Sequence, residues 1–299
     1  MHGLRRKSAL VTGASRGIGR GIALRLAQDG AIVAVNYASD KSAADETVAL
    51  IEKAGGRAFT VQAELGTASA VENLLDATQA GFVEHAGSSK LDILVNNAGM
   101  KGFDLLDALT EETVDSYFTV NAKAPFFLIM KALPLMPDGG RIINISSSST
   151  RMASPPSIAY SMSKGALEQI AQHLAPVLAP RNITINTVSP GVTVTEHPFY
   201  QDPQFRKWAA GLSIFNRLGT VSEVADIVAF VASEDARWMT GGNIDASGGA
   251  LTALASPQMA EPVDRELSGG SDDLQKLSRV EDADILEAAG LEVVNQPTA

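Results

Sequence analysis

Short apolar runs alternate with helical patterns along the first 250 residues, and this alternation constrains the fold more than any other feature. The runs lie at residues 8–12, 31–36, 57–63, 91–95, 141–145, 183–188 and 243–246. Most of them are apolar throughout, which is typical of strands in a parallel sheet that is covered on both faces. Short connections and right-handed crossovers then predict an α/β, three-layer, doubly wound Rossmann fold with seven parallel strands.

The composition narrows the classes of protein further. The chain has no cysteine and four scattered histidines, so we expect neither a disulfide nor a metal site. The apolar run at residues 8–11 is too short for a signal peptide or a membrane span. The net charge of −10 argues against a nucleic-acid partner. We therefore predict a soluble, cytoplasmic protein that has no membrane partner.

A glycine-rich turn joins the first predicted strand to the first predicted helix, with the spacing Gly13-x-x-x-Gly17-x-Gly19. Glycines let the backbone approach a phosphate closely, and a helix N-terminus adds unpaired N–H groups and the positive end of its dipole. The spacing differs from the G-x-G-x-x-G fingerprint, and a tight turn without a ligand is the alternative. At the head of an alternating α/β pattern, the turn predicts a binding site for the pyrophosphate of a dinucleotide.

The end of the second predicted strand indicates which dinucleotide binds. An acidic residue at this point would bond the free ribose 2′-hydroxyl of NAD, but the chain has Asn36. Asn36 does not repel a 2′-phosphate, and Arg16 in the glycine turn can pair with one. We therefore expect NADPH as the cofactor; Arg16 as an ordinary surface charge is the competing interpretation.

Tyr160 and Lys164 stand four positions apart at the start of an apolar helical pattern. Residues at this spacing share one face of a helix, so the hydroxyl and the ammonium can point into the same cavity. A neighbouring cation favours the phenolate and lowers the pKa of a tyrosine, which suits proton transfer near neutral pH. A surface lysine beside a half-buried tyrosine is the alternative.

Together, the motifs resemble those of a known family in order and in spacing. They are Thr12-Gly13-x-x-x-Gly17-x-Gly19, Asn96-Asn97-Ala98-Gly99, Asn121, the serine run at 146–149, Tyr160-x-x-x-Lys164 and Pro190-Gly191-x-x-x-Thr195. The series is similar to that of the classical short-chain dehydrogenase/reductases, and most of all to the 3-oxoacyl-[acyl-carrier-protein] reductase type. The resemblance covers about residues 5–250, and we expect one Rossmann domain at residues 1–250.

The resemblance implies roles for four catalytic residues. Tyr160 would be the general acid, which gives its proton to a carbonyl oxygen as hydride arrives at the carbonyl carbon. Lys164 would lower the pKa of Tyr160 and hold the nicotinamide ribose. Ser147, thirteen positions before the tyrosine, would hydrogen-bond the substrate oxygen. Asn121 would hold a helix open so that a water can relay protons to Lys164.

The resemblance also implies the residues that contact the cofactor. These are Gly13, Ser15, Arg16, Gly17, Ile18, Gly19, Asn36, Glu64, Leu65, Asn97, Ala98, Gly99, Tyr160, Lys164, Pro190, Gly191, Val192 and Thr195. Glu64 departs from the aspartate that the family usually carries at the adenine ring, so its extra methylene puts that contact in doubt.

The segment at residues 196–216 concentrates aromatic side chains, which are scarce elsewhere in the chain. They are Phe199, Tyr200, Phe205, Trp208 and Phe215, and Phe103, Met152 and Ile158 are candidates for the same wall. We interpret the segment as a mobile lid over a largely apolar substrate. The alternative is that these aromatics pack the segment on the core.

The last 49 residues, 251–299, fall outside the family pattern and carry ten acidic and three basic residues. We expect an acidic, partly disordered extension that is either a solubilising tail or a segment that docks on a neighbouring subunit.

The function that follows is NADPH-dependent reduction of a ketone to a secondary alcohol, by a homotetramer or a dimer. The substrate is expected to be a small molecule, 3-oxoacyl-like or otherwise apolar, and free or bound to a carrier protein. Two alternatives stay open: an alcohol dehydrogenase that works in the oxidative direction, and a non-catalytic NADP(H)-binding scaffold or sensor.

Overall fold

The computed structural model of the protein describes residues 3–67, 69–102, 104, 106–196, 200 and 202–250. The predicted extension at 251–299 lies outside the described residues, as do Phe103 and Phe199 of the predicted substrate wall.

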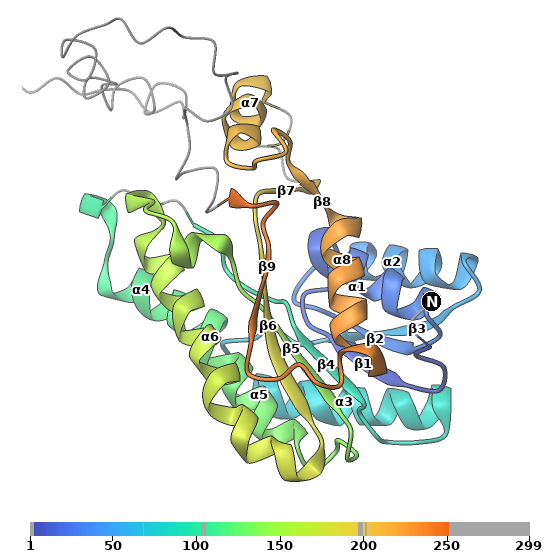
Figure 1. Ribbon diagram of the computed structural model, residues 1–299. Coiled ribbons are helices and arrows are strands. Elements are labelled where there is room, and N and C mark those ends of the chain that lie inside the picture. The colour runs from blue at the N-terminus through green and yellow to red at the C-terminus, as the bar shows by residue number, and fades with distance from the viewer. Residues whose placement is uncertain are drawn as a thin grey trace, which may run out of the picture.

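Seven parallel strands form one sheet at the centre of the molecule, in the order β3-β2-β1-β4-β5-β6-β9 (Figure 1). They are β1 (Ser8–Val11), β2 (Ile32–Tyr37), β3 (Arg57–Gln62), β4 (Ile93–Asn96), β5 (Arg141–Ile145), β6 (Thr184–Pro190) and β9 (Asn243–Ala246). The strand order reverses between β1 and β4, and such a switch point is where open α/β sheets bind their ligands. The predicted fold and its strands are confirmed, with strand ends that shift by two residues or fewer.

Helices cover both faces of the sheet and make the outer two layers (Figure 1). One face packs against α1 (Gly17–Gln28), α2 (Lys41–Lys53) and α8 (Val221–Val231). The other face packs against α3 (Ala70–Ala86), α5 (Ala124–Ala132) and α6 (Ile158–Leu178). Each face of the sheet is therefore apolar, which explains why the strands read as continuous apolar runs.

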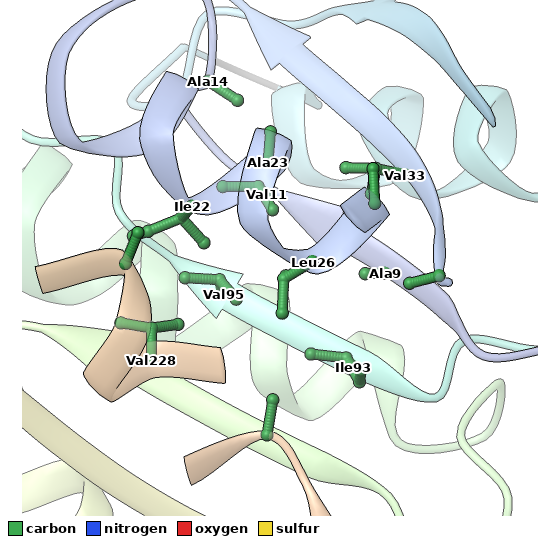
Figure 2. Close-up of a cluster of buried hydrophobic side chains, with 14 of the residues drawn as sticks. Ala9, Val11, Ala14, Ile22, Ala23, Leu26, Val33, Ile93, Val95 and Val228 are labelled. Carbon is green, nitrogen blue, oxygen red and sulfur yellow. The ribbon is translucent and has the colours of Figure 1, made fainter. Parts of the chain in front are cut away.

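The two faces of β1 show how one strand supplies both cores. Ala9 and Val11 point into the core beneath α1, where they lie near Ile22 and Leu26 (Figure 2). Leu10, between them, belongs to the core on the α3 and α5 side. Because successive side chains of a strand point to opposite faces, four buried residues anchor the sheet to both helix layers.

The last core helix begins with a capping box, and the spacing Thr220-x-x-Glu223 in the sequence predicts it. Thr220 accepts a hydrogen bond from the backbone N–H of Glu223 at 3.3 Å, and the Glu223 carboxylate accepts one from the backbone N–H of Thr220 at 2.8 Å. This reciprocal capping box satisfies two amides that would otherwise lack partners at the start of α8.

The apolar helical pattern around residues 114–133 predicts one long helix, but the structure interrupts it. It consists of α4 (Glu111–Phe118), a π-helical turn (Thr119–Lys123) and α5. The apolar period alone could not reveal the interruption, because a single π turn adds one residue without changing which side chains are apolar. Asn121 lies within this turn.

Several short elements lie at the carboxyl edge of the sheet and were not predicted. The helix α7 (Pro203–Gly211) lies beyond the sheet, and β7 (Thr193–Val194) pairs with β8 (Gly219–Thr220) below it (Figure 1). The described 3₁₀ turns are Leu106–Ala108, Ser148–Arg151, Pro155–Ser157, Ala179–Arg181 and Glu234–Ala236.

No helix within the described ranges has the length and apolar character that crossing a membrane requires.

Candidate active site

The glycine turn between β1 and α1 leaves no room for side chains on its inner surface. A Cβ on Gly19 would lie 2.3 Å from the carbonyl oxygen of Gly13 and 2.4 Å from the amide nitrogen of Asn97. Only glycine therefore allows the first turn of α1 to pack this closely on the loop that precedes it. The packing leaves the N-terminus of α1 facing the carboxyl edge of the sheet, where the helix dipole favours a phosphate.

The loop after β4 is fastened to this turn. The Thr12 hydroxyl accepts hydrogen bonds from the backbone N–H groups of Asn97 and Ala98, each at 2.9 Å. The Asn97 amide donates in return to the carbonyl oxygens of Thr12 at 2.8 Å and Gly13 at 3.1 Å. The two predicted cofactor-binding loops are therefore a single hydrogen-bonded unit on either side of the switch point.

Asn36 joins the glycine turn to the neighbouring strands. Its side chain is 1% exposed and points into the protein. Its Oδ1 accepts from the backbone N–H of Gly13 at 3.0 Å, while its Nδ2 donates to the carbonyl oxygens of Val61 and Ala63. Because its amide ties β2 and β3 to the glycine turn, the Asn36 side chain shapes the cradle.

Arg16 lies at the mouth of the turn and is paired. Its guanidinium contacts the Asp40 carboxylate at 2.7 Å, and both side chains are largely exposed. Exposed pairs of this kind contribute little to stability and exchange partners easily. Arg16 is therefore positioned to move from Asp40 to a phosphate at small cost.

Glu196 is a residue of this region that sequence reasoning missed. Its carboxylate accepts a hydrogen bond from the backbone N–H of Gly17 at 3.1 Å, and it lies 3.8 Å from the guanidinium of Arg20. A carboxylate at the N-terminus of α1 lies where a phosphate is expected to bind. Its one sequence signal is its place directly after the Pro190–Thr195 motif, at the carboxyl edge of the sheet.

Tyr160 and Lys164 lie on the first turns of α6 and face the loop after β4. The Lys164 ammonium is buried, donates to the carbonyl oxygen of Ile145 at 2.8 Å and lies 6.0 Å from the centre of the Tyr160 ring. A Cβ on Gly99 would lie 3.1 Å from the same ammonium. Since Gly99 follows the loop that is fastened to the glycine turn, the lysine adjoins the predicted dinucleotide site.

Ser147 is the serine of the run that reaches Tyr160, as its spacing predicted. The Ser147 side chain acts on Tyr160 by lowering the pKa of its phenol, and Ser147 also caps the following 3₁₀ turn by accepting from the backbone N–H of Ser149 at 3.2 Å. Ser146, by contrast, points away and donates to the Glu168 carboxylate at 2.7 Å. The structure therefore brings Ser147, Tyr160 and Lys164 to one place.

The pKa of Tyr160 moves in the direction opposite to the prediction. Burial raises it above its ordinary value, and the nearby Ser147 side chain only partly opposes this change. Burial and the positive charge of Lys101 lower the pKa of Lys164 to about 8. The expectation failed because the sequence shows neighbouring charges but not desolvation, which is the larger effect here. Tyr160 is consequently a neutral phenol at neutral pH.

Asn121 lies in the π-helical turn and is fully buried. Its amide accepts from the backbone N–H of Met100 at 2.8 Å and donates to the carbonyl oxygen of Met100 at 3.1 Å. It also donates to the Ser163 hydroxyl at 2.9 Å. Asn121 thus connects the loop after β4 to α6, between Tyr160 and Lys164.

The remaining predicted cofactor residues line the carboxyl edge of the sheet. Ser15 and Leu65 are buried, Ile18 and Val192 are half-buried, and Glu64 is exposed. Pro190 ends β6, and Gly191 packs against the backbone of Ser247. The Thr195 methyl group lies 3.4 Å from the position that a Cβ on Gly17 would take. Pro190, Gly191, Val192 and Thr195 therefore lie on the β6 side of the glycine turn, whereas Glu64 and Leu65 follow β3 on its other side.

The predicted lid carries a row of aromatic side chains at the edge of the site. The rings of Tyr200 and Phe205 lie 5.8 Å apart, and those of Phe205 and Trp208 lie 5.6 Å apart. Trp208 is 48% exposed and Phe215 is 65% exposed. The exposure of these two side chains disagrees with the alternative in which all the aromatics pack the segment on the core.

Met152 lies where the lid meets the serine run. Together with Ser148 and Val192 it lines a small cavity, to which Ala209 of α7 and Leu212, directly after α7, also contribute. Ile158, at the start of α6, is exposed. Met152 is therefore placed as a wall residue between Ser147 and the lid.

Comparisons with known proteins give matches to reductases. A family model described as enoyl-(acyl carrier protein) reductase matches residues 13–250. LugOII, a promiscuous reductase that catalyses keto-reduction at C1 during lugdunomycin biosynthesis, is 54% identical, with 83% of this chain and 99% of that chain covered and a TM-score of 0.82.

Two further relatives have related activities. The angucycline C-6 ketoreductase LanV, solved with bound NADP, is 53% identical over 84% of this chain and 97% of that chain, with a TM-score of 0.82; it was also solved with NADP and rabelomycin. The 3-oxoacyl-[acyl-carrier-protein] reductase FabG of Staphylococcus aureus is 37% identical over 81% of this chain and 97% of its own length.

The fold, the motif order and these matches define an oxidoreductase of the Rossmann type. The chain belongs to the short-chain dehydrogenase/reductase family, as its motifs predicted.

Proposed function

We propose that the chain is an NADPH-dependent ketoreductase that acts on a polycyclic ketone of the kind handled by LanV and LugOII. The observation that carries the proposal is the meeting of Ser147, Tyr160 and Lys164 beside the loop that is fastened to the glycine turn. The half-exposed aromatic row on the lid suits a large, flat, apolar substrate better than a linear acyl chain.

The residues fit the cofactor. The cradle at Gly13 and Gly19 would bring the backbone against the pyrophosphate, Arg16 would hold the 2′-phosphate, and Lys164 would hold the nicotinamide ribose. Bound NADPH supplies the hydride. Glu196 must give up its bond to the Gly17 N–H group before a phosphate can take that position.

Residues of the chain itself would carry out the proton transfer to the substrate. Tyr160 would donate its phenolic proton to the carbonyl oxygen of the substrate, and Ser147 would hydrogen-bond that oxygen while negative charge develops on it. Lys164, which is cationic at neutral pH, would stabilise the resulting phenolate. Because its pKa is raised, Tyr160 is protonated before the reaction, as a proton donor for ketone reduction must be.

A direct test follows NADPH absorbance with rabelomycin, with a 3-oxobutanoyl thioester and without any ketone. We expect turnover with rabelomycin, slower turnover with the thioester and a preference for NADPH over NADH. A preference for the thioester would move the substrate class towards carrier-bound acyl groups. NADPH binding without turnover of any ketone would favour the non-catalytic scaffold, and turnover only of alcohols with NADP⁺ would favour the oxidative enzyme.

We also propose that the protein is a cytoplasmic homotetramer. Exposed apolar side chains on two neighbouring helices support the assembly, namely Phe126, Phe127 and Met130 on α5 and Met162 on α6. Apolar patches of this kind on soluble proteins typically mark contacts between chains. Light scattering coupled to gel filtration tests this assembly, and Phe127→Glu is expected to release smaller species.

A further inference from the structure

The loop that follows β4 is clamped at two points on either side of Gly102. The first clamp is the pair of hydrogen bonds between Asn121 and the backbone of Met100. The second is at Asp104, whose backbone N–H donates to the carbonyl oxygen of Pro156 at 2.8 Å. Pro156 lies four residues before Tyr160, so the second clamp connects this loop to the start of α6.

Asp104 makes a further bond to α4. Its carboxylate accepts a hydrogen bond from the Tyr117 hydroxyl at 2.6 Å. Tyr117 is 2% exposed, and the burial of its ring together with the Asp104 carboxylate raises the pKa of Tyr117 to about 12. The phenol is therefore a permanent donor, and a hydrogen bond to an ionised acceptor is among the stronger and more directional ones.

The backbone at Gly102 is shaped around this hydroxyl. A Cβ on Gly102 would lie only 1.3 Å from the Tyr117 oxygen and 2.7 Å from the Asp104 carboxylate. Only a residue without a side chain can pass this close to both groups. The loop, the tyrosine and the aspartate consequently fit one another in one arrangement.

The ring of Tyr117 contacts the candidate catalytic tyrosine. The centres of the Tyr117 and Tyr160 rings lie 6.4 Å apart with an angle of 68° between their planes, an edge-to-face contact. Such contacts prefer a defined orientation of the two rings. Tyr117 therefore connects the anchored carboxylate of Asp104 to one side of the Tyr160 ring.

From this arrangement we infer that Tyr117 and Asp104 are positioning residues for Tyr160, which hold its ring at the angle that presents the phenolic proton to the substrate carbonyl. The inference rests on the proposed function, since it takes Tyr160 as the proton donor. Neither residue touches the reacting atoms. Their effect is on the geometry of proton transfer, where a displacement of about 1 Å can cost up to ~100-fold in rate.

The test compares Tyr117→Phe, Asp104→Ala and Asp104→Asn in the full-length enzyme with NADPH and rabelomycin. Tyr117→Phe keeps the ring and removes the hydroxyl, while Asp104→Asn keeps an oxygen that can accept the hydrogen bond. We expect Tyr117→Phe and Asp104→Ala to lower kcat about tenfold, and Asp104→Asn to retain most of the rate. The double variant should be no slower than the slower single variant, because both changes break the same contact.

Three further measurements separate positioning from loop stability. The Kd of NADPH, from fluorescence titration, should not change, and the kinetic isotope effect with 4-deuterated NADPH should rise as the chemical step slows. Thermal unfolding reports any loss of stability. Asp107→Ala, three residues further along the chain and exposed, is the matched control and should match the wild-type enzyme.

Wild-type kcat in both Tyr117→Phe and Asp104→Ala would contradict the positioning role, as would multiplicative losses in the double variant. If Tyr117→Phe does not fold, Asp104→Ala and Asp104→Asn still decide the matter, because Asp104 lies on a loop. Failure of the wild-type enzyme to reduce any ketone would instead contradict the proposed function and, with it, this role.

Discussion

The two halves of the site are held together in different ways. On the cofactor side, the buried side chains of Asn36 and Thr12 and the half-buried side chain of Asn97 use their hydrogen-bonding groups on the backbone around the glycine turn. On the substrate side, Trp208 and Phe215 leave about half or more of their surface in solvent. The cofactor cradle is therefore built before any ligand arrives, whereas the substrate wall still has apolar surface to cover.

This contrast indicates that the hydride-transfer chemistry and the choice of substrate depend on separate parts of the chain. Changes in the preformed half should alter rate or cofactor affinity, because its groups have one arrangement. Changes in the lid should alter substrate affinity with little effect on stability, because exposed side chains contribute little to folding.

Removal of the phenolic proton should give the largest effect. Tyr160→Phe is expected to lower kcat by about 10²- to 10⁴-fold, the usual contribution of a positioned general acid. The Kd of NADPH from fluorescence titration should stay within about twofold of the wild-type value, since the ring is kept. Turnover at the wild-type rate would remove Tyr160 from the mechanism.

A matched pair in the serine run sharpens this result. Ser147→Ala should lower kcat by a smaller factor in the same direction, because the hydroxyl that faces Tyr160 is lost. Ser149→Ala, two residues along, should leave kcat near the wild-type value. Equal losses in both variants would point to damage to the loop instead of to catalysis.

The buried ammonium of Lys164 should make stability depend on pH. Its pKa is about 8 in the folded protein and near the ordinary 10.5 in the unfolded chain. Between these values the unfolded chain binds more protons, so stability rises with pH across this window. Lys164→Met removes the effect. The free energy of unfolding of the wild-type enzyme, relative to that of the variant, should therefore rise by about 2 kcal/mol between pH 7 and pH 9.5.

Denaturant unfolding at the two pH values measures this difference, and a range that ends at pH 9.5 avoids most tyrosine ionisation. Lys53→Met, at the exposed end of α2, is the control and should show no such pH dependence. A wild-type stability that falls relative to Lys164→Met as the pH rises would contradict the buried, cationic lysine.

The next smaller effect concerns the edge of the cofactor half. Arg16→Ala is expected to raise the KM for NADPH about tenfold, the scale of one hydrogen bond to a charged group, and to leave the KM for NADH unchanged. Steady-state kinetics with both cofactors measures the change in preference. Lys53→Ala serves as the control for loss of a surface cation. Equal rises in the KM for NADPH and for NADH would show that Arg16 does not bind the 2′-phosphate.

The smallest effect is expected on the lid. Trp208→Ala should raise the KM for rabelomycin a few-fold, in line with the loss of part of one aromatic contact, and change the free energy of unfolding by only about 0.5 kcal/mol. Trp238→Ala, which removes the other, fully exposed tryptophan, is the control. A large loss of stability in Trp208→Ala would favour the interpretation that the lid aromatics pack on the core.

Patterns between near neighbours predicted most of the fold. The apolar runs identified all seven strands of the sheet, and the Thr220–Glu223 pair identified the start of α8. The π-helical turn at Thr119–Lys123 was not predicted, although Asn121 within it was. The Asn121 side chain bonds to Met100, twenty-one residues earlier in the chain, and no local period records such a bond.

The motifs named candidate residues for the site, but the role of each residue was harder to predict. Motif order selected Ser147 and Tyr160, which the structure brings together. It also assigned Asn36 to the cofactor, whereas the structure uses that side chain inside the sheet. Tyr117 was missed even though it stands four positions before Asn121 on neighbouring turns, because its meaning depends on Asp104 and Tyr160, which come from other elements.

The sequence by itself determined the parallel sheet, the glycine cradle and the identity of the tyrosine and lysine, since each depends on the spacing of residues close together in the chain. The tertiary structure alone decided that burial raises the pKa of Tyr160, that Glu196 reaches the Gly17 N–H group and that Asp104 anchors Tyr117. The physical reason is that desolvation and long-range hydrogen bonds depend on which surfaces pack together. Packing is a property of the whole chain.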